Sequence, residues 1–186
     1  MAGRRRRFDR EEVLDLITRA FWRAGYDATS VADLTRLTGV NPPSLYAAFG
    51  DKKALFAEVV ERYLRTYGAF AGLALREEPT ARAAVERILR EAATAYTDPA
   101  RPRGCLLLSV PELVAHRRAA IDAVEAKIRA DVASGVLPAT TEAHGLAVFV
   151  GATVRGMSGL ARDGATREEL GHVARAALTA WPAPVP

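Results

Sequence analysis

The side chains with the greatest catalytic potential in this chain are three histidines and one cysteine. His116, His144 and His172 lie far apart in the sequence, so we expect them at the surface or at helix ends. Cys105 is the only cysteine, which excludes an internal disulfide and a multi-thiolate zinc site. It is either a small buried apolar residue or a redox-sensing thiol. With no phosphate-cradling glycine loop and no nucleophile elbow, we expect no enzyme, no metal and no cofactor.

A different chemistry is available to the four consecutive arginines at residues 4–7. The chain has 26 Lys and Arg against 22 Asp and Glu, and its formal net charge is +4. Residues 1–66 hold 12 of the basic and 9 of the acidic residues, so this third carries +3 of the excess. An arginine run is either a solvated tail or an arm that neutralises nucleic-acid phosphates, and composition leaves both readings open.

Length and composition place the chain among ordinary globular proteins. Its 186 residues suffice for one domain, or for two small ones that share a core. No apolar segment follows the arginine run, so we expect no secretory signal. Residues 145–161 are apolar apart from Arg155, but this stretch is short and holds four glycines, which suits a buried helix better than a membrane span. We therefore expect a cytoplasmic protein.

Helices must position these groups. Alanine supplies 37 of the 186 residues, and no long stretch alternates with period two, so the expected fold class is all-α. Asp9, Thr29 or Ser30, Asn41 and Asp51 are predicted to cap the first four helices, and the fourth is predicted to run from about residue 52 into the seventies. Further helices are predicted at residues 80–97, 106–115, 117–134, 141–162 and 167–181.

Residues 29–53 have the pattern of a helix-turn-helix, a unit that can place its second helix in a DNA major groove. The turn centres on Gly39. The side chains predicted to hold the two helices from within are Leu34, Leu37, Val40, Leu45 and Phe49. Those left near the outer face are Pro42, Pro43, Ser44, Tyr46, Ala47 and Ala48. A helical hairpin that serves packing alone would show the same pattern.

Residues 45–56, Leu-Tyr-Ala-Ala-Phe-Gly-Asp-Lys-Lys-Ala-Leu-Phe, resemble the signature of the TetR family of bacterial transcriptional regulators. In that family a Tyr-x-x-Phe element ends the recognition helix, and a small-polar-Lys step opens the next helix. The pairs Ala20-Phe21 and Gly25-Tyr26 and the triplets at 29–31 and 38–40 also fall at the family's spacing. The resemblance extends over residues 8–63, and segments 102–107 and 156–161 are similar to one large subgroup.

The resemblance implies an N-terminal arm and DNA-binding domain at residues 1–50, with the helix-turn-helix at about 30–49. A helical effector-binding and dimerisation domain would follow at 51–186, with helix 51–74 as connector. By position, Ser30 would cap the second helix and meet a phosphate, Ser44 and Tyr46 would reach bases or phosphates, and Lys52 would contact the backbone. The expected DNA-binding residues are Ser30, Val31, Pro42, Pro43, Ser44, Tyr46, Ala48 and Lys52.

The outer face of the third helix lacks Arg, Asn and Gln, so direct readout would rely on Ser44, Tyr46 and apolar contacts with thymine methyls. Further specificity could come from DNA shape, or from the arginine arm in the minor groove.

For the larger domain the resemblance implies a ligand pocket and a dimer interface. The candidate pocket residues, which are otherwise ordinary core, are Tyr67, Phe70, Leu75, Tyr96, Leu107, Val110, Leu113, Phe149, Val150, Thr153 and Met157. Gly145, Gly151, Gly156 and Gly159 leave parts of the helix at 141–162 smooth. Gly151, Gly156 and Gly159 are the candidates for the interface, because glycine lets another helix approach closely.

The sequence-based hypothesis is a homodimeric repressor that binds a palindromic operator in double-stranded DNA. A small, largely apolar effector would release it by favouring a different separation of the two recognition helices. The alternative is a DNA-binding architectural or protein-interaction module of the same fold that has no effector. A helical enzyme is disfavoured because no catalytic cluster is present.

Overall fold

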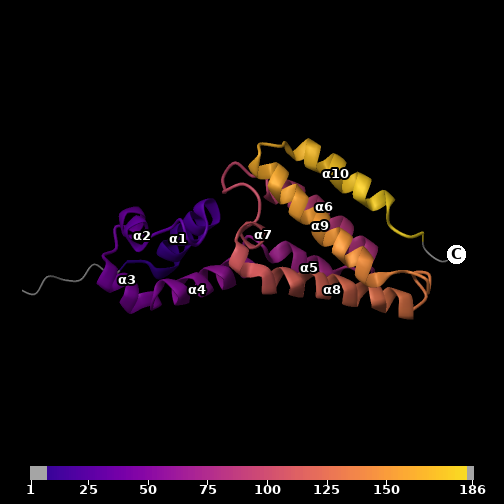
Figure 1. Ribbon diagram of the computed structural model, residues 1–186, viewed down its shortest axis with the longest axis horizontal. Helices are drawn as coiled ribbons and strands as arrows, with labels where there is room; N and C mark the ends of the chain where they lie inside the picture. Colours follow the sequence, from indigo (N-terminus) through magenta and orange to yellow (C-terminus); the bar gives the residue numbers. More distant parts are fainter. Residues whose placement is uncertain (1–7, 184–186) are drawn as a thin grey trace, which may run out of the picture. The chain divides into compact units, whose positions relative to one another are not determined.

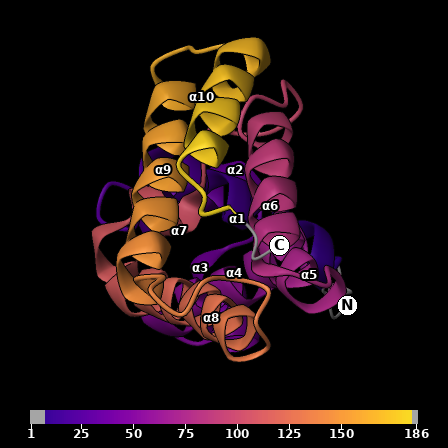
Figure 2. The ribbon, with the colours of Figure 1, turned by 90° about the vertical axis from the view of Figure 1, so that its right-hand side faces the viewer.

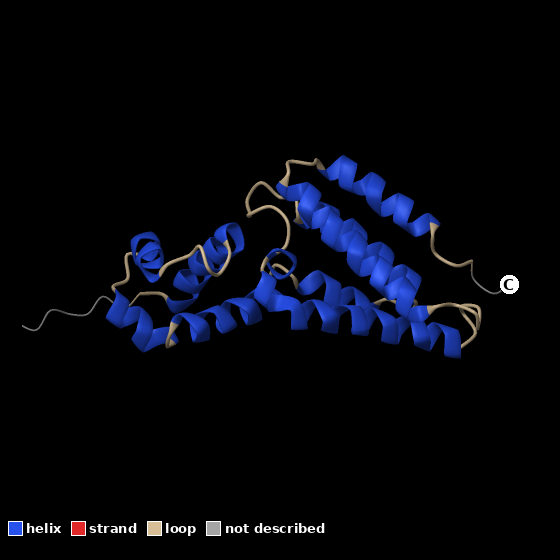
Figure 3. Ribbon diagram, viewed as in Figure 1, coloured by secondary structure: helices blue, strands red, loops and turns tan. Residues whose placement is uncertain are grey.

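The structure is a computed structural model that describes residues 8–183, and the regular secondary structure in that range is entirely helical (Figures 1 and 3). The all-α prediction is confirmed. The arginine run at residues 4–7 lies outside the described residues. None of the helices between residues 8 and 183 has the length and apolar character needed to cross a bilayer. The helices group into two compact units, one ending at Thr66 and the other beginning at Tyr67.

The first unit contains four helices: α1 (Arg10–Ala24), α2 (Val31–Thr38), α3 (Pro42–Phe49) and α4 (Lys52–Arg65). Helices α1 and α4 pack through aromatic side chains, with the rings of Trp22 and Tyr63 edge to face at 4.9 Å. The guanidinium of Arg62 on α4 adds ion pairs to α1, at 2.6 Å to Glu11 and 3.1 Å to Asp15. This unit therefore extends beyond residue 50 and includes α4, which the sequence assigned to the following domain.

The helix predicted from residue 52 into the seventies is two helices, so that prediction is wrong. Helix α4 ends at Arg65, and α5 (Ala69–Glu77) begins after Gly68. Thr66 leaves the helical region, with φ −120° and ψ −89°, and its N–H still donates to Arg62 O at 3.0 Å. A β-branched residue close to a glycine weakens a helix at this point, and the apolar periodicity on either side conceals the break.

The second unit contains α5, α6 (Ala81–Ala95), α7 (Leu106–Ser109), the 3₁₀ turn η1 (Pro111–Leu113), α8 (Val114–Ala133), α9 (Ala143–Arg162) and α10 (Arg167–Thr179). Helix α10 packs on α6 and α9, and α9 packs along α8 (Figure 2). Buried side chains of α6 and α9, such as Leu89 and Met157, form the core between them. Asp131, buried on α8, accepts the N–H of Ala81 at 2.7 Å and so caps α6.

The predicted helix at 106–115 is also wrong. Helix α7 has a single turn, because Pro111 has no N–H to donate and opens the 3₁₀ turn instead. Arg117 donates from Nη1 to two carbonyl groups beside this break, Leu107 O at 2.9 Å and Val110 O at 2.7 Å, and Val110 O also accepts the N–H of Leu113 at 3.2 Å. Helix α8 consequently begins at Val114, earlier than predicted.

The two sequence segments that are similar to a TetR subgroup, 102–107 and 156–161, lie against each other. The N–H of Cys105 donates to Ser158 Oγ at 2.9 Å, and Arg103 donates from Nε to Ala161 O at 2.5 Å and from Nη2 to Ala165 O. Gly104 has φ +75°, and a Cβ there would lie 2.8 Å from Ser158 O. Only glycine fits this contact, which joins the loop before α7 to the C-terminal part of α9.

Candidate nucleic-acid interface

The interior of the helix-turn-helix is built by fewer residues than predicted. Leu34, Val40, Leu45 and Phe49 are buried, as expected, but Leu37 is 47% exposed, so its predicted inward position is wrong. On this short helix Leu37 is rotated by about 60° from Leu34, away from the side that Thr38 occupies. Thr38 is half-buried and uses its hydroxyl twice, donating to Leu34 O at 2.8 Å and accepting from Val40 N–H at 3.2 Å.

Ser30 caps α2 in a complete capping box. Its Oγ accepts the N–H of Asp33 at 3.1 Å, while the Asp33 carboxylate accepts both the Ser30 N–H and the Ser30 hydroxyl. These hydrogen bonds from Ser30 are the main reason that the pKa of Asp33 is lowered. Both Ser30 groups expected to meet a phosphate are therefore already engaged. The donors at this helix end are instead the N–H groups of Val31 and Ala32, which have no intrahelical acceptor.

The start of α3 is closed in a different way. Asn41 Oδ1 accepts the N–H of Ser44 at 2.9 Å, and the two preceding helical positions are Pro42 and Pro43, which have no N–H. The first turn of α3 therefore offers no free backbone donor, so backbone N–H groups cannot bind an anion at this helix end. A partner at the start of α3 would therefore be bound by side chains.

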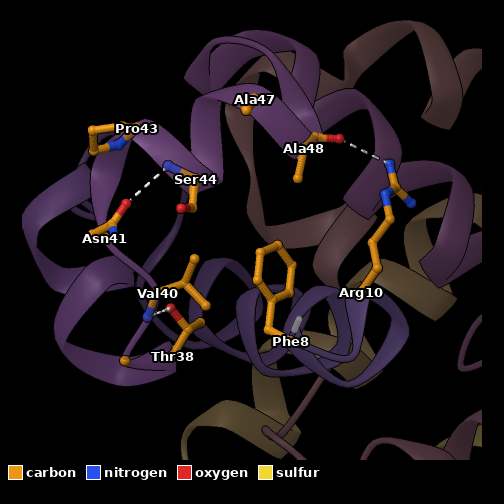
Figure 4. Close-up of a pocket in the computed structure, with 10 residues that line it drawn as sticks. Phe8, Arg10, Thr38, Val40, Asn41, Pro43, Ser44, Ala47 and Ala48 are labelled. Carbon is orange, nitrogen blue, oxygen red and sulfur yellow. Dashed lines mark hydrogen bonds between the residues drawn. The ribbon is translucent and has the colours of Figure 1, made fainter. Parts of the chain in front are cut away.

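The outer face of α3 is small and apolar except for Tyr46. Pro42, Pro43 and Ala47 are exposed, Tyr46 is 48% exposed, and Ser44 and Ala48 are half-buried. Beside this face lies an open groove with a volume of about 950 Å³. Figure 4 shows Pro43, Ser44, Ala47 and Ala48 along one wall and Phe8 and Arg10 along the other. The groove thus runs between α3 and the start of α1.

Lys52 is the first residue of α4 and is half-buried. Its Nζ lies 4.2 Å from the centre of the Tyr26 ring, a cation–π contact that fixes the side chain without neutralising its charge. The Tyr26 ring in turn packs on Phe56 at 4.8 Å. The cation that the sequence assigned to the DNA backbone is thus held in place by the aromatic core of the unit.

Phe8 and Arg10 were missed as site residues from the sequence. Phe8 stacks on Phe49 at 6.4 Å, and Arg10 reaches across to the end of α3 and to Glu58 of α4. Their distance from α3 in the sequence gives no signal of this contact. Arg10 is one of 26 cations, and nothing in the local pattern distinguishes it.

In the second unit the candidate pocket residues differ in how deeply they are buried. Tyr96, Val110, Leu113, Val150 and Met157 are buried, and Tyr67, Phe70, Leu75, Leu107 and Thr153 are half-buried. Phe149 is 41% exposed on α9, so it is not part of the buried core, and its place in a pocket stays a prediction. The surface hollows found in this unit, between α6 and α10 and beside the end of α8, are lined by other residues.

The three candidate interface glycines occupy two different environments. A Cβ at Gly151 would lie 3.0 Å from Cγ1 of Ile121, so this glycine serves the packing of α9 on α8. At Gly156 and Gly159 an added Cβ would meet no atom within 4 Å, and both lie on the exposed side of α9. That side also carries the exposed apolar side chains Val148, Phe149 and Leu160.

The residues with catalytic potential remain scattered. His144 Nδ1 lies 2.8 Å from Glu125, which joins α9 to α8, and His116 and His172 are exposed. Cys105 is buried. Within residues 8–183 no group of three His, Cys, Asp or Glu side chains could hold a metal ion.

Comparison with known proteins agrees with this geometry. Residues 13–59 match the family described as bacterial regulatory proteins, tetR family. The HTH-type transcriptional repressor ComR of Escherichia coli (strain K12) is 32% identical over 193 residues, covering 97% of this chain and 92% of ComR. The repressor BdcR of the same organism is 39% identical over 106 residues, covering 57% of this chain and 54% of BdcR.

A solved structure extends the similarity to the whole fold. A cysteine-substituted TetR family transcriptional regulator, CifR, in complex with a 26 bp double-strand operator DNA, is 38% identical to this chain. It matches with a TM-score of 0.89 over 96% of this chain and 100% of CifR.

Proposed function

The chain belongs to the TetR family of bacterial regulatory proteins, and on this premise we propose that it is a transcriptional repressor that binds double-stranded operator DNA as a homodimer. The observation that carries the proposal is the outer face of α3. Tyr46, Pro42, Pro43 and Ala47 are exposed on a helix whose other side is fixed by buried Leu45 and Phe49. The similarity to ComR, a repressor, and to operator-bound CifR supports this assignment.

The chemistry of the face predicts how DNA would be read. Phosphates would be met by the free N–H groups of Val31 and Ala32 at the start of α2 and by Lys52, contacts that position the protein without reading sequence. Base edges would be met by the Tyr46 hydroxyl and by Ser44. The prolines and alanines of α3 would contact thymine methyl groups.

Pairing of two chains would use the exposed side of α9, supported by α10. Val148, Phe149 and Leu160 would be covered there, and Gly156 and Gly159 would let the helices approach closely. A two-fold axis would present two copies of α3 to successive major grooves, about 34–36 Å apart along the duplex.

An effector would act by binding one separation of the recognition helices better than the other. Its site would lie in the second unit among the buried and half-buried candidates, such as Tyr96, Phe70 and Met157. A ligand with equal affinity for both arrangements would not release DNA, however tightly it bound.

The proposal is tested by selecting binding sites from a random duplex pool with the full chain. We expect enrichment of an inverted repeat whose half-sites are separated by whole helical turns. Failure to enrich any sequence, with equal binding of all duplexes, would show that the chain does not read an operator.

Effector response is tested separately by thermal shift against a library of apolar small molecules. A true effector raises the melting temperature as its concentration rises. At 100 times its Kd it increases the free energy of unfolding by about 2.7 kcal/mol, and it also releases the selected DNA. Binding of a selected operator with no such compound would favour the same-fold module without an effector.

A further inference from the structure

We propose that Arg10 is a positioning residue that clamps the C-terminal end of the recognition helix, and that Glu58 holds Arg10 in place. The inference rests on the proposed function of α3 as the DNA-reading helix. Neither residue lies on α3, and neither was expected from the sequence to take part in DNA binding.

The guanidinium of Arg10 contacts two other helices at once. Its Nη2 donates to both carboxylate oxygens of Glu58 on α4, at 2.6 Å and 2.8 Å. Its Cζ lies 4.5 Å from the centre of the Phe49 ring, the last residue of α3. Nη2 also lies 3.4 Å from Ala48 O, the contact drawn in Figure 4. One side chain from the start of α1 therefore joins the end of α3 to α4.

The C-terminal end of α3 has carbonyl groups without intrahelical donors, and Arg10 lies beside one of them. Ala48 O is one of the last four carbonyl groups of the helix, which have no intrahelical donor, and the last turn of α3 contains no basic residue. A cation this close to the carbonyl opposes the negative end of the helix dipole, and the 3.4 Å contact adds a weak hydrogen bond. Asn41 fixes the first turn of α3, so with Arg10 both ends of a helix of only eight residues are held by side chains from outside it.

A rival role for Arg10 is direct contact with a DNA phosphate. Its side chain is 45% exposed and lines the groove beside α3. The two roles predict opposite effects of Glu58 on operator affinity. For a clamp, Glu58 supplies the second anchor and should favour operator binding. For a phosphate ligand, Glu58 competes with the phosphate and should oppose it.

The experiment compares Arg10→Lys, Arg10→Gln, Glu58→Gln and the Arg10→Gln/Glu58→Gln double variant of the full chain. Affinity is measured for the selected operator and for random duplex over a range of salt. The matched controls are Arg65→Gln and Glu61→Gln, an exposed pair at 4.0 Å on the same unit. Amide hydrogen exchange at Gly50, whose N–H donates to Tyr46 O at 2.9 Å, reports directly on the end of α3.

If Arg10 is a clamp, each single variant lowers operator affinity about five- to tenfold, because a charge-assisted contact is lost. Arg10→Lys also loses affinity, because an ammonium can keep the hydrogen bonds that Nη2 makes but has no flat guanidinium face to pack over the Phe49 ring. The double variant is no weaker than the singles, exchange at Gly50 accelerates, and both random-duplex affinity and the salt slope stay unchanged.

The proposal is overturned if Arg10→Lys keeps wild-type affinity, if Arg10→Gln flattens the salt slope by about 0.9, or if Glu58→Gln binds the operator as well as or better than wild type. It is also overturned if the control pair shows the same loss. Failure of the proposed function is a different result, because the wild-type chain would then select no operator at all.

Discussion

Gly156→Leu should stabilise the single chain, whereas Gly151→Leu should destabilise it. Gly156 lies in helix α9 with no atom within 4 Å of a Cβ position, so a side chain there enters open space. Replacing a mid-helix glycine by a good helix former should stabilise the separated chain by about 1 kcal/mol. For a domain of this size that raises the melting temperature by about 2–4 °C.

At Gly151 the same change meets Ile121. A Cβ would lie 3.0 Å from Cγ1 and 3.2 Å from Cδ1 of that side chain, closer than most carbon contacts. The larger leucine must displace the Ile121 side chain or push α9 away from α8, and we expect overpacking of this kind to cost about 1–3 kcal/mol. Against the helix-propensity gain, the net result is a lower melting temperature.

The assay combines thermal melting at low protein concentration with sedimentation velocity and operator binding. If α9 of one chain crosses its counterpart near Gly156, Gly156→Leu sediments as a stable monomer with full helical circular dichroism and binds operator weakly. A Gly156→Leu chain that remains dimeric and binds operator at wild-type strength would refute the crossing. A Gly151→Leu chain that melts above wild type would refute the packing argument.

Three further outcomes are expected from the sequence and the structure. Tyr46→Ala should weaken operator binding more than random-duplex binding, whereas Lys52→Ala should weaken both about equally; equal losses for Tyr46→Ala would make it a positioning residue. Deletion of residues 1–7 should flatten the slope of log affinity against log salt by about 0.9 per lost phosphate contact, and an unchanged slope would identify a solvated tail. The pKa of Glu169 is held below its usual 4.5 mainly by hydrogen bonds from Thr166, so its carboxylate stabilises α10 above that pH. The melting-temperature advantage of wild type over Glu169→Gln, followed by circular dichroism, should therefore persist down to pH 4.5 and shrink below it; an advantage that does not change with pH would contradict the assignment.

The starts of α1 to α4 and of α6 were well predicted because the responsible contacts are local. Asp9, Ser30, Asn41, Asp51 and Thr80 each accept an N–H from two or three residues further along the chain, and the residue types alone indicate this. Helix interruptions were predicted less well. The break at Thr66 falls inside an apolar repeat. The turn at Pro111 is bound by Arg117, six residues beyond it, which donates to Val110 O and Pro111 O.

The site could be predicted as a segment and not as a set of contacts. The outward position of Tyr46 follows from helical spacing. The Ser30 hydroxyl could donate to Asp33 or to a DNA phosphate, and the folded structure shows that it donates to Asp33. The partnership of Arg10 with Glu58 joins residues 48 positions apart and leaves no trace in either local sequence.

The contact between Cys105 and Ser158 makes the chain its own reporter of local opening. The thiol belongs to the only cysteine, is 7% exposed, and lies in a loop joined to α9 by the Cys105 N–H and by Arg103. Burial beside this cysteine raises the pKa of Tyr96 well above its usual value, which marks the surroundings as dry. An alkylating reagent can reach the sulfur only while the loop is detached, so the labelling rate at rising reagent concentration measures the opening equilibrium and then the opening rate. Mass spectrometry of the alkylated wild-type protein would thus measure the rate at which the loop before α7 separates from α9.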